Sequence, residues 1–219
     1  MKIGILGTGT VGATIGSRLV DLGHEVMMGS RTAKNEKALA FVTKHVGVNT
    51  YAGTFAEAAN FGEIIFNCTK GEHSLNAISL AGNALNGKIL VDVSNPLDFS
   101  QGMPPCLIPS LANTNSLGEE IQRKFPEVKV VKTFNTMWCG LMADPNLIGG
   151  GNHINYICGN DASAKKSCVD LIKQFGWTDQ NILDLGDITN ARGTEATLLI
   201  WLRVYGATKT GAFNFNIIK

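Results

Sequence analysis

A glycine-rich stretch near the start of the chain, GILGTGTVGATIG at residues 4–16, constrains the fold more than any other feature of the sequence. Gly7, Gly9 and Gly12 within it have the spacing G-x-G-x-x-G. The apolar residues before them are typical of a buried strand, and the residues after them are typical of a helix. A G-x-G-x-x-G motif in the turn between a strand and a helix indicates a dinucleotide-binding unit. The chain is therefore predicted to begin with such a unit.

Each of the three glycines has a different predicted role. Gly7 makes a tight turn, Gly9 lets the backbone approach a pyrophosphate, and Gly12 lets the helix pack closely on the strand. The free amide groups and the positive dipole end of the following helix favour phosphate groups. The residues predicted to form this site are Gly7, Thr8, Gly9, Thr10, Val11 and Gly12.

The residues after the second apolar run distinguish NADP from NAD. NAD-dependent enzymes place an Asp or Glu on the ribose 2′-hydroxyl about 20 residues after the glycines. This chain has Gly29-Ser30-Arg31-Thr32 at that place, without a carboxylate. A hydroxyl and a guanidinium suit a 2′-phosphate, and the flat guanidinium also suits stacking on adenine. Ser30 and Arg31, which Lys34 and Lys37 follow in the sequence, therefore predict NADP(H); the alternative is a solvated basic helix start.

Short apolar runs alternate with segments of helical pattern along the whole chain. The runs that predict strands are 2–6, 24–28, 48–52, 63–67, 88–93, 128–134, 153–159 and 181–186. The segments that predict helices are 11–22, 34–45, 54–60, 74–85, 116–125, 161–175 and 190–205. Alternation of this kind favours a parallel sheet covered by helices on both faces, and continuous apolarity fits strands buried on both sides.

The predicted fold class is therefore α/β: a Rossmann-type doubly wound, mainly parallel sheet with a small C-terminal α/β extension. We expect one NADP-binding domain over residues 1–219, in which 136–219 is the extension that contributes the acceptor pocket. A proline- and asparagine-rich loop at 94–115 interrupts the alternation, and loops of that length are usually functional or mobile.

Residues that follow three further strands belong to the same predicted site, because ligands of doubly wound sheets lie across the carboxyl ends of the strands. These additional cofactor-binding candidates are Thr69, Lys70, His73, Asn95, Pro96, Asn135 and Cys139. His73 and Asn135 are the candidates for a catalytic role, although a histidine that begins a helix is more often a cap or surface residue. Trp138 fits an aromatic wall for a planar substrate or simple core packing.

Charge and cysteine usage exclude several other classes of protein. The formal net charge of +1 does not predict a nucleic-acid partner, and five cysteines without a Cys-x-x-Cys pair predict neither a disulfide framework nor a metal site. The apolar stretch at 196–202 is too short for a membrane helix. We expect a cytoplasmic protein whose partner is a small molecule.

Several stretches resemble the NADP-dependent oxidoreductases that use an 8-hydroxy-5-deazaflavin coenzyme, and the related reductase domain of six-transmembrane metalloreductases. The matching stretches are IGILGTGTVG, LGHEVMMGSRT, ILVDVSNPL, VVKTFNT and CGNDASAKKSCVDLIKQFGW. The resemblance implies hydride transfer between NADP(H) and a flavin or deazaflavin-type acceptor. It also implies a homodimer, and a lysine that assists Arg31 in binding NADP, for which Lys34 and Lys37 are both candidates. The resemblance places the C-terminal segment 197–215 beside the acceptor.

Two other functions are compatible with the same motifs. One is an NADPH-dependent imine or carbonyl reductase resembling pyrroline carboxylate reductase, but that family generally needs a larger helical second domain. The other is a non-catalytic module that senses NADP(H) and regulates a partner. Turnover with a suitable acceptor distinguishes these alternatives.

Overall fold

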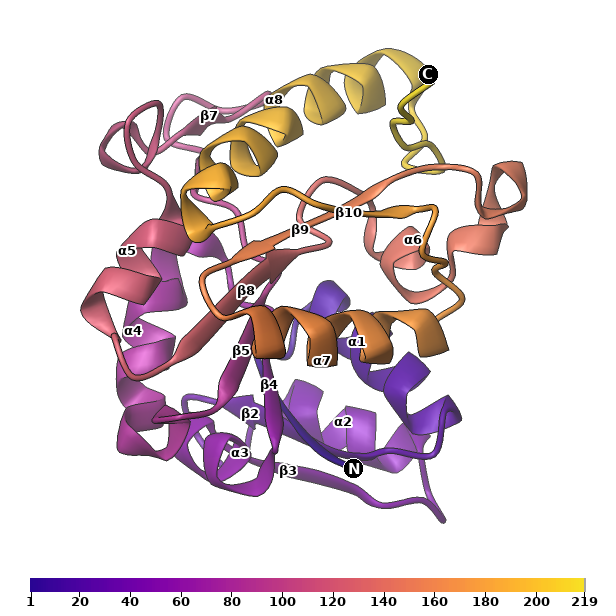
Figure 1. The fold of residues 1–219 in the computed structure, drawn as a ribbon. Coiled ribbons are helices and arrows are strands. Elements are labelled where there is room, and N and C mark those ends of the chain that lie inside the picture. Colours follow the sequence, from indigo (N-terminus) through magenta and orange to yellow (C-terminus); the bar gives the residue numbers. More distant parts are fainter. Residues whose placement is uncertain (219) are drawn as a thin grey trace.

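An eight-stranded sheet forms the centre of the computed structural model, which describes residues 1–218 (Figure 1). The strand order is β3-β2-β1-β4-β5-β8-β9-β10, and every pair is parallel except β8 with β9. The strands are β1 (Lys2–Leu6), β2 (Glu25–Ser30), β3 (Thr50–Thr54), β4 (Ile64–Asn67), β5 (Ile89–Asp92), β8 (Lys129–Thr133), β9 (Asn155–Gly159) and β10 (Ile182–Asp184). The expected α/β fold with a mainly parallel sheet is confirmed.

Helices cover both faces of the sheet. They are α1 (Thr10–Asp21), α2 (Glu36–Lys44), α3 (Phe55–Phe61), α4 (Gly71–Ala81), α5 (Leu117–Lys124), α6 (Cys139–Ala143), α7 (Ala162–Gln174) and α8 (Ala191–Thr208). One buried apolar cluster joins the sheet to α1, α2, α6 and α7, and a second joins it to α3, α4, α5 and the start of α8. Because β1, β2, β4, β5 and β8 are parallel, their carboxyl ends lie at the same edge of the sheet, between the two helix layers.

The structure differs from the sequence prediction at a few boundaries. The helix expected at 74–85 begins at Gly71, and its last turn is a 3-10 helix over Gly82–Leu85. The loop at 94–115 contains a small antiparallel pair, β6 (Leu97–Asp98) and β7 (Cys106–Leu107), and helix α6 was not predicted. These elements are too short for hydrophobic periodicity to reveal them.

The segment 136–219 was predicted as an extension. Its described residues, 136–218, add β9 and β10 to the same sheet, and α7 packs against that sheet. Phe134 follows β8 directly and has a φ of +65°, and the side-chain Oδ1 of Asn155 accepts from the Phe134 amide at 3.1 Å. The Thr133 hydroxyl also donates to this oxygen, at 3.2 Å. These contacts join the end of β8 to the start of β9, which pairs with it in the antiparallel direction.

Side chains cap several helices at their first turns. Asn35, Thr54, Ser116 and Asp161 accept from the backbone at the starts of α2, α3, α5 and α7. Asp161 makes the most contacts: its Oδ1 accepts from the Ala164 amide at 2.8 Å and from the Ser163 hydroxyl at 2.6 Å, and its Oδ2 lies 3.1 Å from Lys129 Nζ. These contacts attach α7 to the start of β8.

We expect Asp161→Ala to lower the melting temperature at neutral pH. The Ser163 hydrogen bond, the Ala164 amide and Lys129 together hold the pKa of Asp161 below its ordinary value of 3.8. The stabilisation is present above that ordinary value and is lost as the pH falls towards the lower folded-state pKa. Thermal unfolding followed by circular dichroism should therefore show a difference from the wild type that shrinks below pH 3.8. Asp161→Asn keeps a capping oxygen and should cost less; an equal effect at every pH would contradict the assignment.

Candidate functional site

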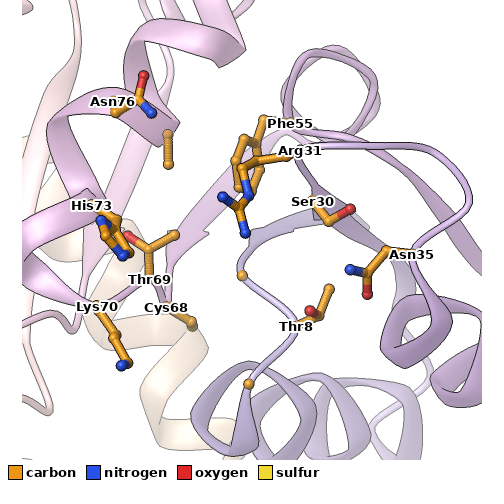
Figure 2. A pocket seen from close by; sticks show the side chains of 13 residues that line it. Thr8, Ser30, Arg31, Asn35, Phe55, Cys68, Thr69, Lys70, His73 and Asn76 are labelled. Atoms are coloured by element: carbon orange, nitrogen blue, oxygen red, sulfur yellow. The ribbon is translucent and has the colours of Figure 1, made fainter.

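A cleft of about 330 Å³ opens at the carboxyl ends of β1, β2 and β4. Figure 2 shows Arg31 pointing into it on one side, and Thr69 and His73 on the opposite wall. The residues that line the cleft are Gly7, Thr8, Gly9, Ser30, Arg31, Asn35, Phe55, Cys68, Thr69, Lys70, His73, Asn76 and Ala77. Eight of the seventeen predicted cofactor residues are therefore brought together here: Gly7, Thr8, Gly9, Ser30, Arg31, Thr69, Lys70 and His73.

The three motif glycines have different surroundings. Gly7 has a φ of +116°, and a Cβ there would lie 2.8 Å from the Cys68 carbonyl oxygen. A Cβ on Gly12 would lie 2.1 Å from the Gly7 carbonyl oxygen. A Cβ on Gly9, in contrast, would have no other atom of residues 1–218 within 4 Å. Packing thus accounts for two of the glycines, whereas Gly9 leaves open space in front of helix α1.

Two helices begin at the cleft without a side-chain cap. Gly9 is the N-cap of α1 and Lys70 is the N-cap of α4, and within the described part of the chain neither start has a side-chain cap bond. Helix α1 also has no acidic residue in its first turn. Uncapped helix starts leave amide donors for an anion. The open space at Gly9 and the uncapped start of α1 together fit a pyrophosphate group.

Ser30 and Arg31 form a turn at the end of β2. The Ser30 hydroxyl donates to the Thr32 carbonyl at 2.6 Å and accepts from the Thr32 amide at 3.2 Å. Its single proton is therefore used within the turn, and Ser30 serves to present the exposed Arg31 to the cleft. Lys34 and Lys37 do not line this cleft; Lys37 lines an adjoining groove along α1 and α2, together with Thr10.

His73, one of the two candidates for catalysis, stands on the cleft wall near the start of α4. Its Nε2 lies 3.7 Å from Glu72 Oε1, and the side chains of both residues are largely exposed. The pair is exposed to solvent at the mouth of the cleft. Glu72 therefore does not hold the imidazole in one fixed, buried position. The geometry suits a polar contact with a ligand more than a positioned proton donor.

Asn95 and Asn135 join the ends of β5 and β8 through their amide groups. Asn95 Nδ2 donates to the Asn135 carbonyl at 2.7 Å, and Asn135 Nδ2 donates to Asn95 Oδ1 at 2.9 Å. A Cβ on Gly71 would lie 2.1 Å from the Asn95 carbonyl oxygen, so the turn at Asn95 and Pro96 packs against the start of α4. Asn135 Oδ1 and the Thr136 hydroxyl are buried without a partner among residues 1–218.

The other predicted residues lie beneath the cleft. Val11 packs against the apolar cluster under α1, and Cys139 is buried in α6, where its Sγ accepts from the Thr14 hydroxyl at 3.7 Å. Burial, reinforced by Asp92 and Cys139, raises the pKa of the Cys68 thiol. A raised pKa disfavours the nucleophilic thiolate form of Cys68.

Some lining residues were not predicted from the sequence. Asn35 caps α2, Phe55 begins α3, and Asn76 and Ala77 lie on α4. The Thr-x-x-Glu capping box before α3 was a signal for the position of Phe55, but not for its place in the lining of the cleft. Asn76 and Ala77 belong to no sequence motif. Only the packing of α4 places them at the cleft, so no signal in the sequence indicated them.

A second recess, of about 470 Å³, lies between the end of α8 and the segment that follows it. We call it the aromatic recess. The residues that line it are Trp138, Trp201, Tyr205, Lys209, Thr210, Gly211 and Ala212. Figure 1 shows α8 running above β8 and β9, at the top of the view. The elements that surround this recess are thus α8, the turn before α6 and the C-terminal segment.

The aromatic recess has flat walls. The Trp201 ring stacks on Tyr205 with centroids 5.5 Å apart and on Phe213 with centroids 5.2 Å apart. Trp138 leaves 42% of its surface exposed, and a Cβ on Gly140 would lie 2.4 Å from its ring. Trp201 Nε1 is buried without a partner in residues 1–218. Trp138 is therefore presented as an aromatic wall rather than packed away in the core.

Two further features bear on the kind of site. Residues 1–218 contain no group of three or more His, Cys, Asp or Glu side chains arranged to hold a metal ion. Within the same residues, no helix combines the length and apolarity needed to span a membrane.

Comparison with known proteins relates this geometry to a family. The family model described as "NADP oxidoreductase coenzyme F420-dependent" matches residues 2–96. The chain is 31% identical to the F420-dependent NADP reductase of Methanocaldococcus jannaschii, over 96% of both proteins. It is 35% identical to metalloreductase STEAP3 of Rattus norvegicus over 89% of this chain, but it spans only 36% of that protein.

Solved structures agree with these relatives. A candidate F420-dependent NADP reductase from Arthrobacter sp. FB24 superposes with a TM-score of 0.92, at 48% identity over the full length of both chains. An imine reductase from Streptomyces aurantiacus has a TM-score of 0.65 at 15% identity, over 93% of this chain and 61% of that one. The second likeness shows a shared fold alone.

Gly9→Ala and Gly12→Ala should separate ligand binding from folding. We expect Gly9→Ala to change the melting temperature little, because no protein atom in residues 1–218 approaches its Cβ, and to weaken NADPH binding at least about tenfold, because the methyl group occupies the space at the amides of α1. Gly12→Ala should lower the melting temperature through its contact with the Gly7 carbonyl. Calorimetric titration with NADPH and thermal unfolding measure the two effects; equal NADPH affinity in Gly9→Ala and the wild type would exclude a pyrophosphate at this place.

Proposed function

Because this chain belongs to the family of F420-dependent NADP reductases, we propose that it transfers a hydride between NADP(H) and a deazaflavin-type acceptor. Family membership supports the enzyme class, an NADP-dependent oxidoreductase. The structural observation that carries the proposal is the open space at Gly9 before the uncapped start of α1, in the same cleft as the exposed Arg31. That arrangement suits a dinucleotide with a third phosphate.

Residues of the cleft would hold NADP(H) along its length. The amides at the start of α1 would bind the pyrophosphate, and Arg31 would bind the 2′-phosphate with charge-assisted hydrogen bonds. Thr69, Lys70 and His73 would contact the remaining part of the cofactor from the opposite wall. The pair formed by Asn95 and Asn135 would support its nicotinamide end.

The cofactor, when bound, supplies the hydride, so the chain contributes alignment and exclusion of water. We therefore propose binding roles for His73 and Asn135 and assign neither of them a proton transfer. Asn135 Oδ1, which has no partner in residues 1–218, suits the amide donors of a nicotinamide carboxamide. Buried acceptors without partners are costly unless a ligand or a water molecule pairs with them.

The aromatic recess is our proposed binding place for the acceptor ring. A flat tricyclic ring can stack on the exposed face of Trp138, and Trp201 Nε1 offers a hydrogen-bond donor. Lys209 adds a cation at the recess. A homodimer that contacts through α8 and a cytoplasmic location stay predictions.

Turnover with defined acceptors tests the function. We expect the protein to oxidise NADPH in the presence of coenzyme F420, measured as loss of NADPH absorbance together with reduction of F420. FMN, FAD and a cyclic imine serve as alternative acceptors. Turnover with the imine alone would make the chain an imine reductase, and NADPH binding without turnover of any acceptor would favour a sensing module.

Arg31→Ala tests the choice of cofactor. Removing a hydrogen-bonded charge should raise the Kd for NADPH about 10- to 100-fold and leave the Kd for NADH almost unchanged. Lys34→Ala is the matched control, because it removes a neighbouring cation that does not line the cleft. Calorimetry with both dinucleotides gives the preference directly, and an unchanged preference in Arg31→Ala would contradict the 2′-phosphate assignment.

A further inference from the structure

A fully buried lysine lies at the meeting point of β5, β8 and α8. Lys132 Nζ donates to Asp92 Oδ2 at 2.8 Å and to the Ser94 carbonyl at 2.6 Å, and it lies 2.8 Å from Glu195 Oε1. An ammonium group has three donors, and these three acceptors use all of them. Burial lowers the pKa of Lys132, but the two carboxylates outweigh burial and raise it, so the side chain is charged.

The Asp92 side of this arrangement leads to the cofactor cleft. Asp92 Oδ1 accepts from Asn67 Nδ2 at 2.8 Å and from the Ser94 hydroxyl at 2.6 Å. Asn67 Oδ1 in turn accepts from the Thr69 hydroxyl at 2.6 Å. Thr69 lines the cleft, and Ser94 precedes the turn at Asn95. Lys132 is thus two side chains away from the cleft wall.

Glu195 joins Lys132 to α8, the helix whose later turns line the aromatic recess. Glu195 accepts from the amides of Leu117 and Gly118, at 2.9 and 3.0 Å, which joins α8 to the start of α5. Burial raises the pKa of Glu195, while Lys132 acts in the opposite direction. Because every partner of Glu195 is a donor, the ionised form is the one that fits. Glu195 belongs to the same buried face of α8 as Trp201, which lines the recess.

Stability alone is a weak reason for such a group. Taking three charges out of water costs several kcal/mol per ion, and well-packed apolar residues are often at least as stabilising. What a charged group supplies in addition is direction, because each hydrogen bond fixes one partner at one distance. Here the partners of Lys132 are Asp92, on the side of the cofactor cleft, and Glu195, on the helix that lines the aromatic recess.

We propose that Lys132 is a positioning residue that fixes the position of the cofactor cleft relative to the aromatic recess. It does so through its contacts with Asp92 on the cleft side and with Glu195 on the recess side. The inference rests on the proposed function, in which NADP(H) lies in the cleft and the acceptor ring lies in the recess. Hydride transfer needs reacting atoms about 3 to 3.5 Å apart, and small displacements of either ligand are costly. A rigid connection between the two places meets that need.

Glu195→Gln and Asp92→Asn test the two contacts of Lys132 separately, because each replaces a carboxylate by an amide of nearly the same size. We expect Glu195→Gln to raise the KM for F420 about tenfold and to change the Kd for NADPH less than about twofold, since it loosens only the α8 side. We expect Asp92→Asn to raise the Kd for NADPH. Lys132→Met should do both. Calorimetric titration with NADPH and steady-state kinetics with F420 measure these effects.

Lys165→Met is the matched control. Its Nζ lies 2.8 Å from Asp184 Oδ1 on the same sheet, but Lys165 lines neither the cleft nor the recess. We expect it to lower the melting temperature and to leave KM and Kd unchanged. Hydrogen exchange provides a readout independent of turnover: amides of α8 should exchange faster in Glu195→Gln and at the wild-type rate in Lys165→Met.

The proposal is overturned if Glu195→Gln and Asp92→Asn behave like the control, with lower melting temperatures but unchanged KM, Kd and α8 exchange. Failure of the wild-type protein to reduce F420 would instead count against the proposed function. In that case the NADPH titrations and the exchange rates of α8 still decide whether Lys132 connects the two sides: unchanged values in all three variants overturn the proposal, and the separate shifts support it.

Discussion

The close approach of helix α1 to the end of strand β1 is the contact on which the arrangement of the site depends. A side chain at Gly12 would overlap the Gly7 carbonyl, so only glycine lets the helix start directly above the turn. This contact directs the first-turn amides of α1 towards the edge where β1, β2 and β4 end. The position of the cleft, and of the pyrophosphate site that we propose there, follows from it.

Polar interactions in the interior have a different distribution from the apolar packing. The two apolar clusters hold helices to the faces of the sheet, whereas the buried polar side chains concentrate near the ends of β4, β5 and β8. Asn67, Asp92 and Lys132 lie at successive strands of that edge. The core therefore sets the overall shape, and the polar residues set the positions of the loops that face a ligand.

The last helix brings distant parts of the chain together. After β9 the chain continues through α7 and β10, and α8 then runs above β8 and β9 in the view of Figure 1. This path brings Trp201 and Tyr205 together with Trp138, more than sixty residues earlier in the sequence. The structure thereby has both the cleft at the ends of β1, β2 and β4 and a second recess around one sheet.

Local sequence determined the fold class, most strand and helix positions, and the glycine turn, because these depend on periodicity and on backbone conformations that few residues adopt. It also indicated Arg31 as the cation of the cleft, since that residue follows directly on a predicted strand. The roles of Ser30 and of the two lysines were harder to predict. The Ser30 proton is used in its own turn. Helix α2 starts between Lys34 and Lys37; neither lysine lines the cleft, and Lys37 lines an adjoining groove.

Only the tertiary structure decided which distant residues meet. Asp92, Lys132 and Glu195 have no common motif or spacing, and their contact results from the pairing of β5 with β8 and the packing of α8. The aromatic recess likewise combines the turn before α6 with the end of α8. Hydrophobic periodicity indicates which face of a helix or strand is buried. It does not indicate which other element packs against that face, because this depends on contacts between residues far apart in the sequence.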